Sequence, residues 1–213
     1  MNAAEEPHHR KLLDNAKTRV FVVELQPGES SEFHRHEIDF VAVALSRVIA
    51  ENETEKTVRV ELSPGEIQVV KTPLTHRITN RAEAPYRVLH VEVKEGFHPA
   101  AIVCGMGKKL CPSEVGDLTD PRAQFTINRV FETDTMRVTE MTVGPGATTP
   151  THQNAHQTLR VPMTEANLEI SRDEEVSKVL LKPGEVAWVE PGVTGKIANS
   201  GQAEARWYEI EFK

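Results

Sequence analysis

Two histidines that lie two residues apart, His34 and His36, are the first residues of this chain whose types and spacing could do chemistry. Positions i and i+2 of a β-strand project from the same face, so both imidazoles could bind one metal ion. Asp39 is the nearest carboxylate, and in an extended segment it shares a face with Val41 and Val43. Asp39 is therefore a candidate ligand, and its alternative role is that of a turn residue.

His76 is the candidate for a third histidine ligand. It follows Gly65 by eleven residues and precedes Asn80 by four, with Pro73 just before it. Three histidines joined by Asp39, or by water, form a donor set that suits Zn, Ni, Fe or Mn. The sequence therefore predicts one divalent transition metal, bound by His34, His36, His76 and Asp39.

Two motifs in the first half of the chain resemble the two motifs of the cupin superfamily. They read Gly28-x5-His34-x-His36 and Gly65-x10-His76-x3-Asn80. The resemblance covers nearly the whole chain and implies a small jelly-roll β-barrel in which the motif histidines hold the metal. Cupins include dioxygenases, isomerases, lyases, storage proteins and sugar-binding domains, so the fold alone does not select a reaction.

The cupin pattern usually places a Glu four or five residues after the second histidine. Phe40 and Val41 occupy those positions here, so a four-ligand site of the family type would depend on Asp39 as a substitute. The segment from Asp39 to Val41 is similar to that of small cupins, some of which are named for β-alanine degradation. Three histidines with water are the alternative.

The chain also repeats itself, which makes it similar to the bicupins. Arg19-Val20, Pro27-Gly28 and His34 recur 118 residues later as Arg137-Val138, Pro145-Gly146 and His152. Pro64-Gly65-Glu66 and Asn80 recur 119 residues later as Pro183-Gly184-Glu185 and Asn199. One inserted residue accounts for the difference. We predict an N-terminal cupin over residues 11–95, a connector over 96–123 and a C-terminal cupin over 124–213.

Short strands are expected in both copies, because apolar and polar residues alternate over 20–25, 87–93, 137–143 and 207–212. No long stretch has a sustained helical period. Pro-Gly and Asn-containing turns separate the strands, a pattern that is typical of a double-sheet sandwich or barrel. We therefore predict an all-β chain of two tandem cupin barrels.

The second copy has lost most of its ligands. His152 aligns with His34, but Asn154 replaces the second histidine, Gln157 stands at the Asp39 position and Gly195 replaces the third histidine. We expect a degenerate site in a structural partner or a metal-free pocket. His156 could restore a partial site if the turn before it bulges.

The remaining candidates receive simpler interpretations. His90 is expected to be a partly exposed strand residue, and His8-His9 to lie in a mobile tail. Cys104 and Cys111 have no metal-ligand partners nearby, so we expect reduced thiols. A local disulfide is the alternative, and it would imply an oxidising compartment.

Composition narrows the class of partner. The formal charge of -7 and the absence of a basic stripe argue against nucleic acid, and no apolar run has the length of a membrane span. The first residues lack the pattern of a secretory signal, so we expect a cytoplasmic protein, with a periplasmic or secreted location open if a signal has been removed. The chain could also form a homodimer, and the sequence does not decide its oligomeric state.

Two functions compete. The first is a metal-dependent enzyme, an oxygenase or a lyase or isomerase, that acts on a small organic acid or similar metabolite. The second is a non-catalytic barrel that senses or stores a small molecule or a metal. No general base is identified apart from Asp39, if that residue is not a ligand.

Overall fold

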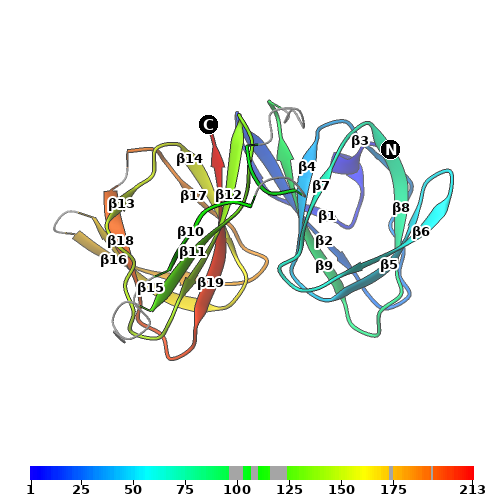
Figure 1. Ribbon diagram of the computed structural model, residues 1–213. Coiled ribbons are helices and arrows are strands. Elements are labelled where there is room, and N and C mark those ends of the chain that lie inside the picture. Colours follow the sequence, from blue (N-terminus) through cyan, green and yellow to red (C-terminus); the bar gives the residue numbers. More distant parts are fainter. Residues whose placement is uncertain (96–102, 107–109, 116–123, 173–174, 193) are drawn as a thin grey trace. The chain divides into compact units, whose positions relative to one another are not determined.

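The chain divides into two compact units, Met1–Gly96 and Phe97–Lys213 (Figure 1). The computed structural model describes residues 1–95, 103–106, 110–115, 124–172, 175–192 and 194–213. Across these residues the regular structure consists of β-strands and one short 3-10 helix, η1 (Ala3–Glu5), which confirms the all-β prediction. None of the helices in the described part has the length and apolar character to cross a bilayer.

The first unit contains η1 and two antiparallel sheets. The larger sheet has the order β1-β2-β9-β4-β7, and the smaller one the order β3-β8-β5-β6. Their strands are β1 (His9–Asp14), β2 (Thr18–Leu25), β3 (His34–His36), β4 (Phe40–Ala44), β5 (Val48–Glu53), β6 (Thr57–Leu62), β7 (Ile67–Val70), β8 (Leu74–Asn80) and β9 (Tyr86–Val93).

The second unit repeats this arrangement and adds one edge strand. Its sheets have the orders β10-β11-β12-β19-β14-β17 and β13-β18-β15-β16. Without β10 these are the orders of the first unit with ten added to each label. The strands are β10 (Ser113–Val115), β11 (Phe125–Glu132), β12 (Met136–Val143), β13 (His152–Gln153), β14 (Gln157–Pro162), β15 (Ala166–Arg172), β16 (Glu175–Leu181), β17 (Ala187–Val189), β18 (Thr194–Asn199) and β19 (Ala205–Phe212).

The four segments predicted as strands lie within β2, β9, β12 and β19, which pair as neighbours in each unit (β2 with β9, β12 with β19). Their alternation arises because one face of each strand contributes to an apolar core inside its unit. Leu25 and Val88 belong to the core of the first unit, and Val143 and Trp207 to the core of the second. Burial of such side chains contributes about 1.5–3 kcal/mol each.

The repeated asparagines Asn80 and Asn199 close equivalent turns. Both side chains are buried, and each amide donates two hydrogen bonds to backbone carbonyls, one of them the carbonyl of the last residue of the neighbouring long strand (Leu25 or Val143). Each side-chain oxygen accepts a backbone N–H two residues on. A buried amide whose hydrogen bonds are all made fixes one turn geometry, which explains why the motif ends on Asn in both copies.

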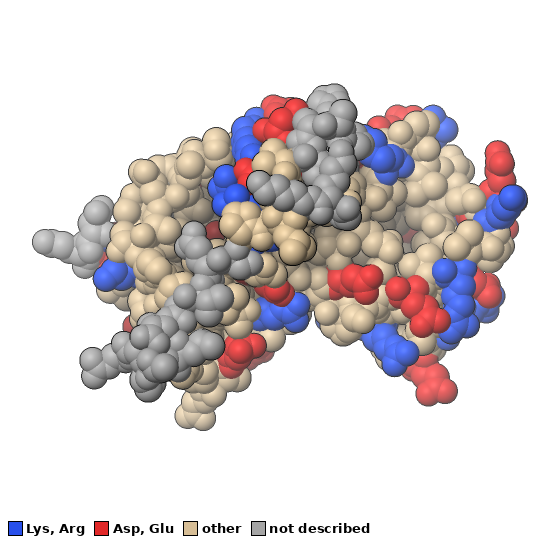
Figure 2. Space-filling view, viewed as in Figure 1, with Lys and Arg blue, Asp and Glu red and all other residues tan. Residues whose placement is uncertain are grey.

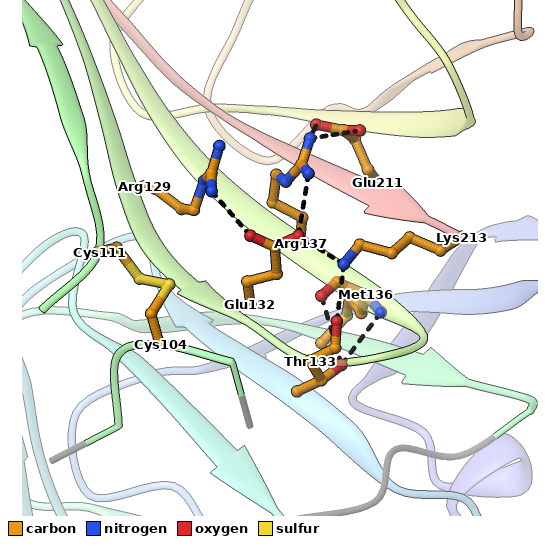
Figure 3. Close-up of polar contacts among 9 residues, drawn as sticks. All are labelled: Cys104, Cys111, Arg129, Glu132, Thr133, Met136, Arg137, Glu211 and Lys213. Atoms are coloured by element: carbon orange, nitrogen blue, oxygen red, sulfur yellow. Dashed lines mark hydrogen bonds and ion pairs between the residues drawn. A yellow bond between two sulfur atoms is a disulfide. The ribbon is translucent and has the colours of Figure 1, made fainter. Parts of the chain in front are cut away.

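The predicted connector falls within the second unit where it is described. Cys104 and Cys111 form a disulfide (Figure 3), so the expectation of reduced thiols was wrong. Backbone hydrogen bonds join Val103 and Cys104 to Glu132, and β10 pairs with β11. Residues 96–102, 107–109 and 116–123 of the connector lie outside the described residues, and His98 is among them.

Charged side chains of both signs are interspersed on the face of the first unit drawn in Figure 2. Exposed ion pairs lie along the smaller sheet of the first unit, namely Arg59–Glu61, Arg77–Glu53 and Arg81–Glu51. Exposed pairs of this kind contribute about 0–1 kcal/mol each, so most of the stability of the fold comes from the apolar cores.

Candidate metal centre

The pairing of β3 with β8 brings the three predicted histidines together. His34 stands directly opposite His76 in the register, and His36 lies on the same face as His34. The ring centroids of His34 and His76 are 4.5 Å apart, and those of His36 and His76 are 5.1 Å apart. The Nε2 atoms of His34 and His36 approach to 3.0 Å. All three side chains are buried, so they face the interior of the unit.

His9 joins this cluster from the start of β1, so the expectation of a mobile tail at this residue was wrong. Its ring centroid lies 4.6 Å from that of His34 and 5.6 Å from that of His36. One nitrogen from each of His9, His34 and His36 lies within 4.8 Å of the others, and these three residues form the one group of metal-ligand atoms found among the described residues. The residues after His9 do not alternate in polarity, so no strand pattern pointed to this histidine.

The second ring nitrogens are held by acceptors, which fixes the tautomers. Nδ1 of His9 donates to the Glu6 carboxylate at 2.7 Å, and Nδ1 of His34 donates to the Glu32 carbonyl at 2.8 Å. Nδ1 of His76 lies 3.0 Å from Oδ1 of Asn52 and donates to it. Each of these rings therefore presents Nε2 as a lone pair, and Nε2 of His9 and His76 is buried without a hydrogen-bond partner in the described part of the chain. Metal-binding histidines have this second hydrogen bond almost without exception.

Glu6 anchors the N-terminal segment that carries His9. Its carboxylate accepts hydrogen bonds from both His8 and His9 and from the backbone N–H of Glu32. Burial alone would raise the pKa of Glu6, but the hydrogen bonds from the two histidines outweigh it and lower the pKa to about 2. His8 also reaches Glu29 at 3.1 Å. The carboxylate is thus ionised at neutral pH and orients the His9 ring.

Burial keeps the clustered imidazoles neutral. It lowers the pKa of His36 to about 2 and that of His76 to about 3, and neighbouring imidazoles add to the effect. Burial also lowers the pKa of His9 to about 4, although Glu6 opposes the shift. Neutral imidazole is the form that binds metal ions, so the cluster is in its ligand form at physiological pH.

His90 also lies at this cluster, so the expectation of a partly exposed strand residue was wrong. It is 4% exposed, and its ring centroid is 5.4 Å from that of His36. The Phe40 ring lies 4.6 Å from both His36 and His90. His90 shares its face of β9 with the core residues Tyr86 and Val88, and this alternation is the signal that could have placed it inside the unit.

A cavity of about 80 Å³ lies in the interior next to His76 and His90. Apart from these histidines, Asn52, Gln68 and Tyr86, its walls are aliphatic or aromatic. None of the described residues that line it carries a formal positive charge. A bound molecule would therefore be small, and any carboxylate on it would find its counter-charge at the histidine cluster and not on the walls.

Asp39, the predicted carboxylate ligand, is not brought into the cluster. Its Oδ2 forms an ion pair with Lys71, and its Oδ1 accepts hydrogen bonds from the backbone and hydroxyl of Thr72 at 2.8 and 2.9 Å. Burial would raise the pKa of Asp39, but these hydrogen bonds lower it. Because Phe40 faces the interior, the preceding Asp39 side chain projects away from it.

The equivalent location in the second unit shows why the ligands are absent. His152 stands opposite Gly195, as His34 stands opposite His76. A Cβ atom at Gly195 would lie 2.3 Å from the Ser171 carbonyl oxygen, so no side chain fits there without a backbone shift. Asn154 is buried and donates to Thr158, and no metal-ligand group involving this unit is found among the described residues.

The sequence matches no protein-family model and no curated protein. Solved structures are similar in fold. AerE from Microcystis aeruginosa is 17% identical, with a TM-score of 0.62, and the match covers 98% of each chain. A structure of oxalate decarboxylase from Bacillus subtilis, from a study of the Mn(II) centres of that enzyme, is 13% identical with a TM-score of 0.61. The match covers 100% of this chain and 76% of the decarboxylase.

A salicylate 1,2-dioxygenase mutant from Pseudoaminobacter salicylatoxidans, solved in complex with gentisate, is 13% identical with a TM-score of 0.60. That match covers 96% of this chain and 74% of the dioxygenase. The similarity to these proteins, together with the strand orders, confirms the predicted fold: the chain has the fold of the cupin superfamily. At this level of identity the likeness concerns the fold and leaves the reaction open.

Proposed function

We propose that this chain is a bicupin whose first barrel binds one divalent transition metal ion through His34, His36, His76 and His9, and that it is a metal-dependent enzyme acting on a small organic acid or similar metabolite. The observation that carries the proposal is the orientation of the imidazoles. Three of them, His9, His34 and His76, have Nδ1 bound to an acceptor in a buried interior. One nitrogen from each of His9, His34 and His36 lies within 4.8 Å of the others, and the His76 ring lies 4.5 Å from that of His34.

A bound cation resolves the contact between His34 and His36. Two imidazole lone pairs 3.0 Å apart repel each other unless one nitrogen carries a proton or both face a shared cation. An all-imidazole donor set suits Zn, Ni or Fe well, and Mn is compatible. Asp39 would join as a ligand only if Lys71 and Thr72 released it, so we assign the fourth ligand to His9 instead.

A bound ion would supply Lewis acidity, or redox chemistry if it is iron or manganese. The residues of the chain perform the other tasks. The aliphatic walls of the cavity exclude water from the cluster, and the absence of wall cations leaves the metal centre as the attachment point for a substrate carboxylate. Phe40, packed on His36 and His90, holds the rings in place.

A non-catalytic metal-binding barrel is the second candidate, and the extent of burial favours it. His34 and His36 are 1% and 0% exposed, and the adjoining cavity measures only about 80 Å³. Structural metal sites are closed by four protein ligands, whereas catalytic sites keep an open position. The two functions therefore differ in whether an external ligand reaches the ion.

The test is elemental analysis of untagged protein, with His76→Ala and His9→Ala as variants and His152→Ala, the counterpart of His34 in the second unit, as control. We expect about one equivalent of a transition metal in the wild type and in His152→Ala, and a loss in the other two variants. Protein that stays metal-free after reconstitution contradicts the proposal. Azide binding to the cobalt-substituted protein, followed by its visible spectrum, then separates an open catalytic site from a closed one.

A further inference from the structure

Charged side chains line a cavity in the second unit, and one of them stands where the first unit has a buried histidine. Glu209 stands at the place of His90, and Arg137 and Glu211 face each other in the register at the places of Arg19 and Glu92. A cavity of about 230 Å³ lies beside them. It is lined by Pro112, Ile127, Arg129, Arg137, Thr139, Met141, Glu209, Glu211 and the loop from His152 to Ala155.

One carboxylate beside this cavity serves three cations (Figure 3). Glu132 accepts hydrogen bonds from Arg129 and Arg137, both at 2.9 Å, and from Lys213 at 2.5 Å. Burial would raise the pKa of Glu132, but the bonds from Arg137 and Lys213 outweigh it and lower the pKa to about 2. The carboxylate is therefore charged, and its acceptor capacity is already shared among three donors.

The remaining carboxylates do not balance the cations. Glu209 is paired with Arg160 at 2.8 Å in a buried ion pair, so it is not available to the other cations. In the part of the chain that the structure describes, Glu211 has one cationic partner, Arg137, and both contacts measure 3.4 Å. Among the described residues, the cluster contains four cations and three carboxylates, which are Arg129, Arg137, Arg160, Lys213, Glu132, Glu209 and Glu211. The net charge of these described groups is one positive, which favours a single negative charge in the cavity.

Both arginines that line the cavity have N–H groups that meet no acceptor among the described residues. Nε of Arg137 is buried and has no hydrogen-bond partner in the described part of the chain. Within the described residues, Arg129 donates one hydrogen bond, from Nη1 to the Glu132 carboxylate. A buried donor without an acceptor costs about 1–3 kcal/mol, so an acceptor oxygen placed at the Arg137 guanidinium group would be favourable.

We propose that this cavity binds a small monocarboxylate. The carboxylate oxygens accept hydrogen bonds from Arg129 and Arg137, and the organic part packs against Ile127 and Met141, which lie on the same wall. A carboxylate is preferred to an inorganic anion because part of the lining is apolar and the cluster requires only one charge. This binding does not depend on a metal, so it is independent of the function proposed for the first unit.

The test uses metal-free protein, prepared with a chelator, and propionate as the probe in isothermal titration or ligand-observed NMR. Propionate is expected to bind in the millimolar range or tighter, and propylamine of similar size is expected not to bind. Inorganic phosphate at the same concentration is the competing anion. Binding of phosphate as tight as that of propionate, or no propionate binding at about 20 mM, would overturn the proposal.

Variants assign the binding to the arginines. Arg129→Gln removes a single hydrogen bond to Glu132 and should weaken propionate binding by about tenfold or more. Lys178→Gln, which changes an exposed cation of the same unit, is the matched control and should bind as the wild type does. Arg137→Gln is informative only where its melting temperature equals that of the wild type. Unchanged affinity in a folded Arg129→Gln variant also contradicts the proposal.

Discussion

The Nδ1 atom of His9 donates to the carboxylate of Glu6 over 2.7 Å, and both side chains are buried. This contact fixes Nε2 of His9 as the lone-pair nitrogen that faces His34 and His36. A segment before the first predicted barrel residue thus takes part in the candidate metal centre. The first prediction tests this relationship directly.

Glu6→Gln should lower the metal affinity of the first unit by about tenfold to a hundredfold, because the carboxylate orients His9 and increases its basicity. The affinity is measured by competition with a chelator of known affinity. Glu37→Gln removes an exposed carboxylate from the same unit and should leave the affinity unchanged. Equal affinities in the two variants would show that His9 does not bind the ion.

Phe40→Ala should destabilise the first unit by about 3–5 kcal/mol, because it removes a fully buried ring that contacts both His36 and His90. The change is measured by chemical denaturation of the metal-free protein. Phe33→Ala is the matched control: this ring is 43% exposed and lies against Arg77. A similar loss in both variants would mean that the packing on the histidines adds no stability.

The spacing of His34 and His36 predicted their shared face from strand geometry, and the resemblance to the cupin motifs added His76, which the register of β3 with β8 places opposite His34. The sequence analysis did not predict His9, since its position depends on which strands pair across the sheet. It also placed His90 wrongly, although the alternation along β9 puts His90 on the face of the core residue Val88. The position of Asp39 depends on a single residue of phase: Phe40 faces inward, so Asp39 faces Lys71 and Thr72. Period-2 patterns fix relative faces within one strand, but they do not say which face is the interior.

Gly195→Ala should destabilise the second unit by about 1–3 kcal/mol, since the added Cβ atom would lie 2.3 Å from a backbone oxygen of Ser171. Gly144→Ala is the control, because its nearest neighbour is the flexible Gln124 side chain at 3.0 Å. Both are compared by thermal unfolding. A neutral Gly195→Ala would imply that the third ligand was lost for a reason other than space.

Glu132 should make the second unit sensitive to acid. Its pKa falls from 4.5 to about 2 on folding, so the stability it contributes is present above pH 4.5 and is lost as the pH falls toward 2. Glu132→Gln removes this dependence. The difference in unfolding free energy between the wild type and the variant should therefore shrink across this pH range. A difference that stays constant with pH would show that Glu132 is not held ionised by Arg137 and Lys213.

The disulfide between Cys104 and Cys111 should stabilise the second unit by about 2 kcal/mol, the scale expected from closing a short loop in the unfolded chain. Loss of the bond also releases one end of the segment in which the backbone N–H groups of Val103 and Cys104 donate to the Glu132 carbonyl. The Glu132 side chain accepts hydrogen bonds from three cationic side chains. The variant in which serine replaces both cysteines should have the same free energy of unfolding in denaturant as the wild type under reducing agent.

The same variant also tests the cavity of the second unit. If binding of propionate weakens in the serine variant, the disulfide supports the cavity wall as well as the fold, because Pro112 follows Cys111 and lines the cavity. If the serine variant has the same free energy of unfolding and the same propionate affinity as the wild type, the disulfide contributes to neither and only tethers the described part of the connector.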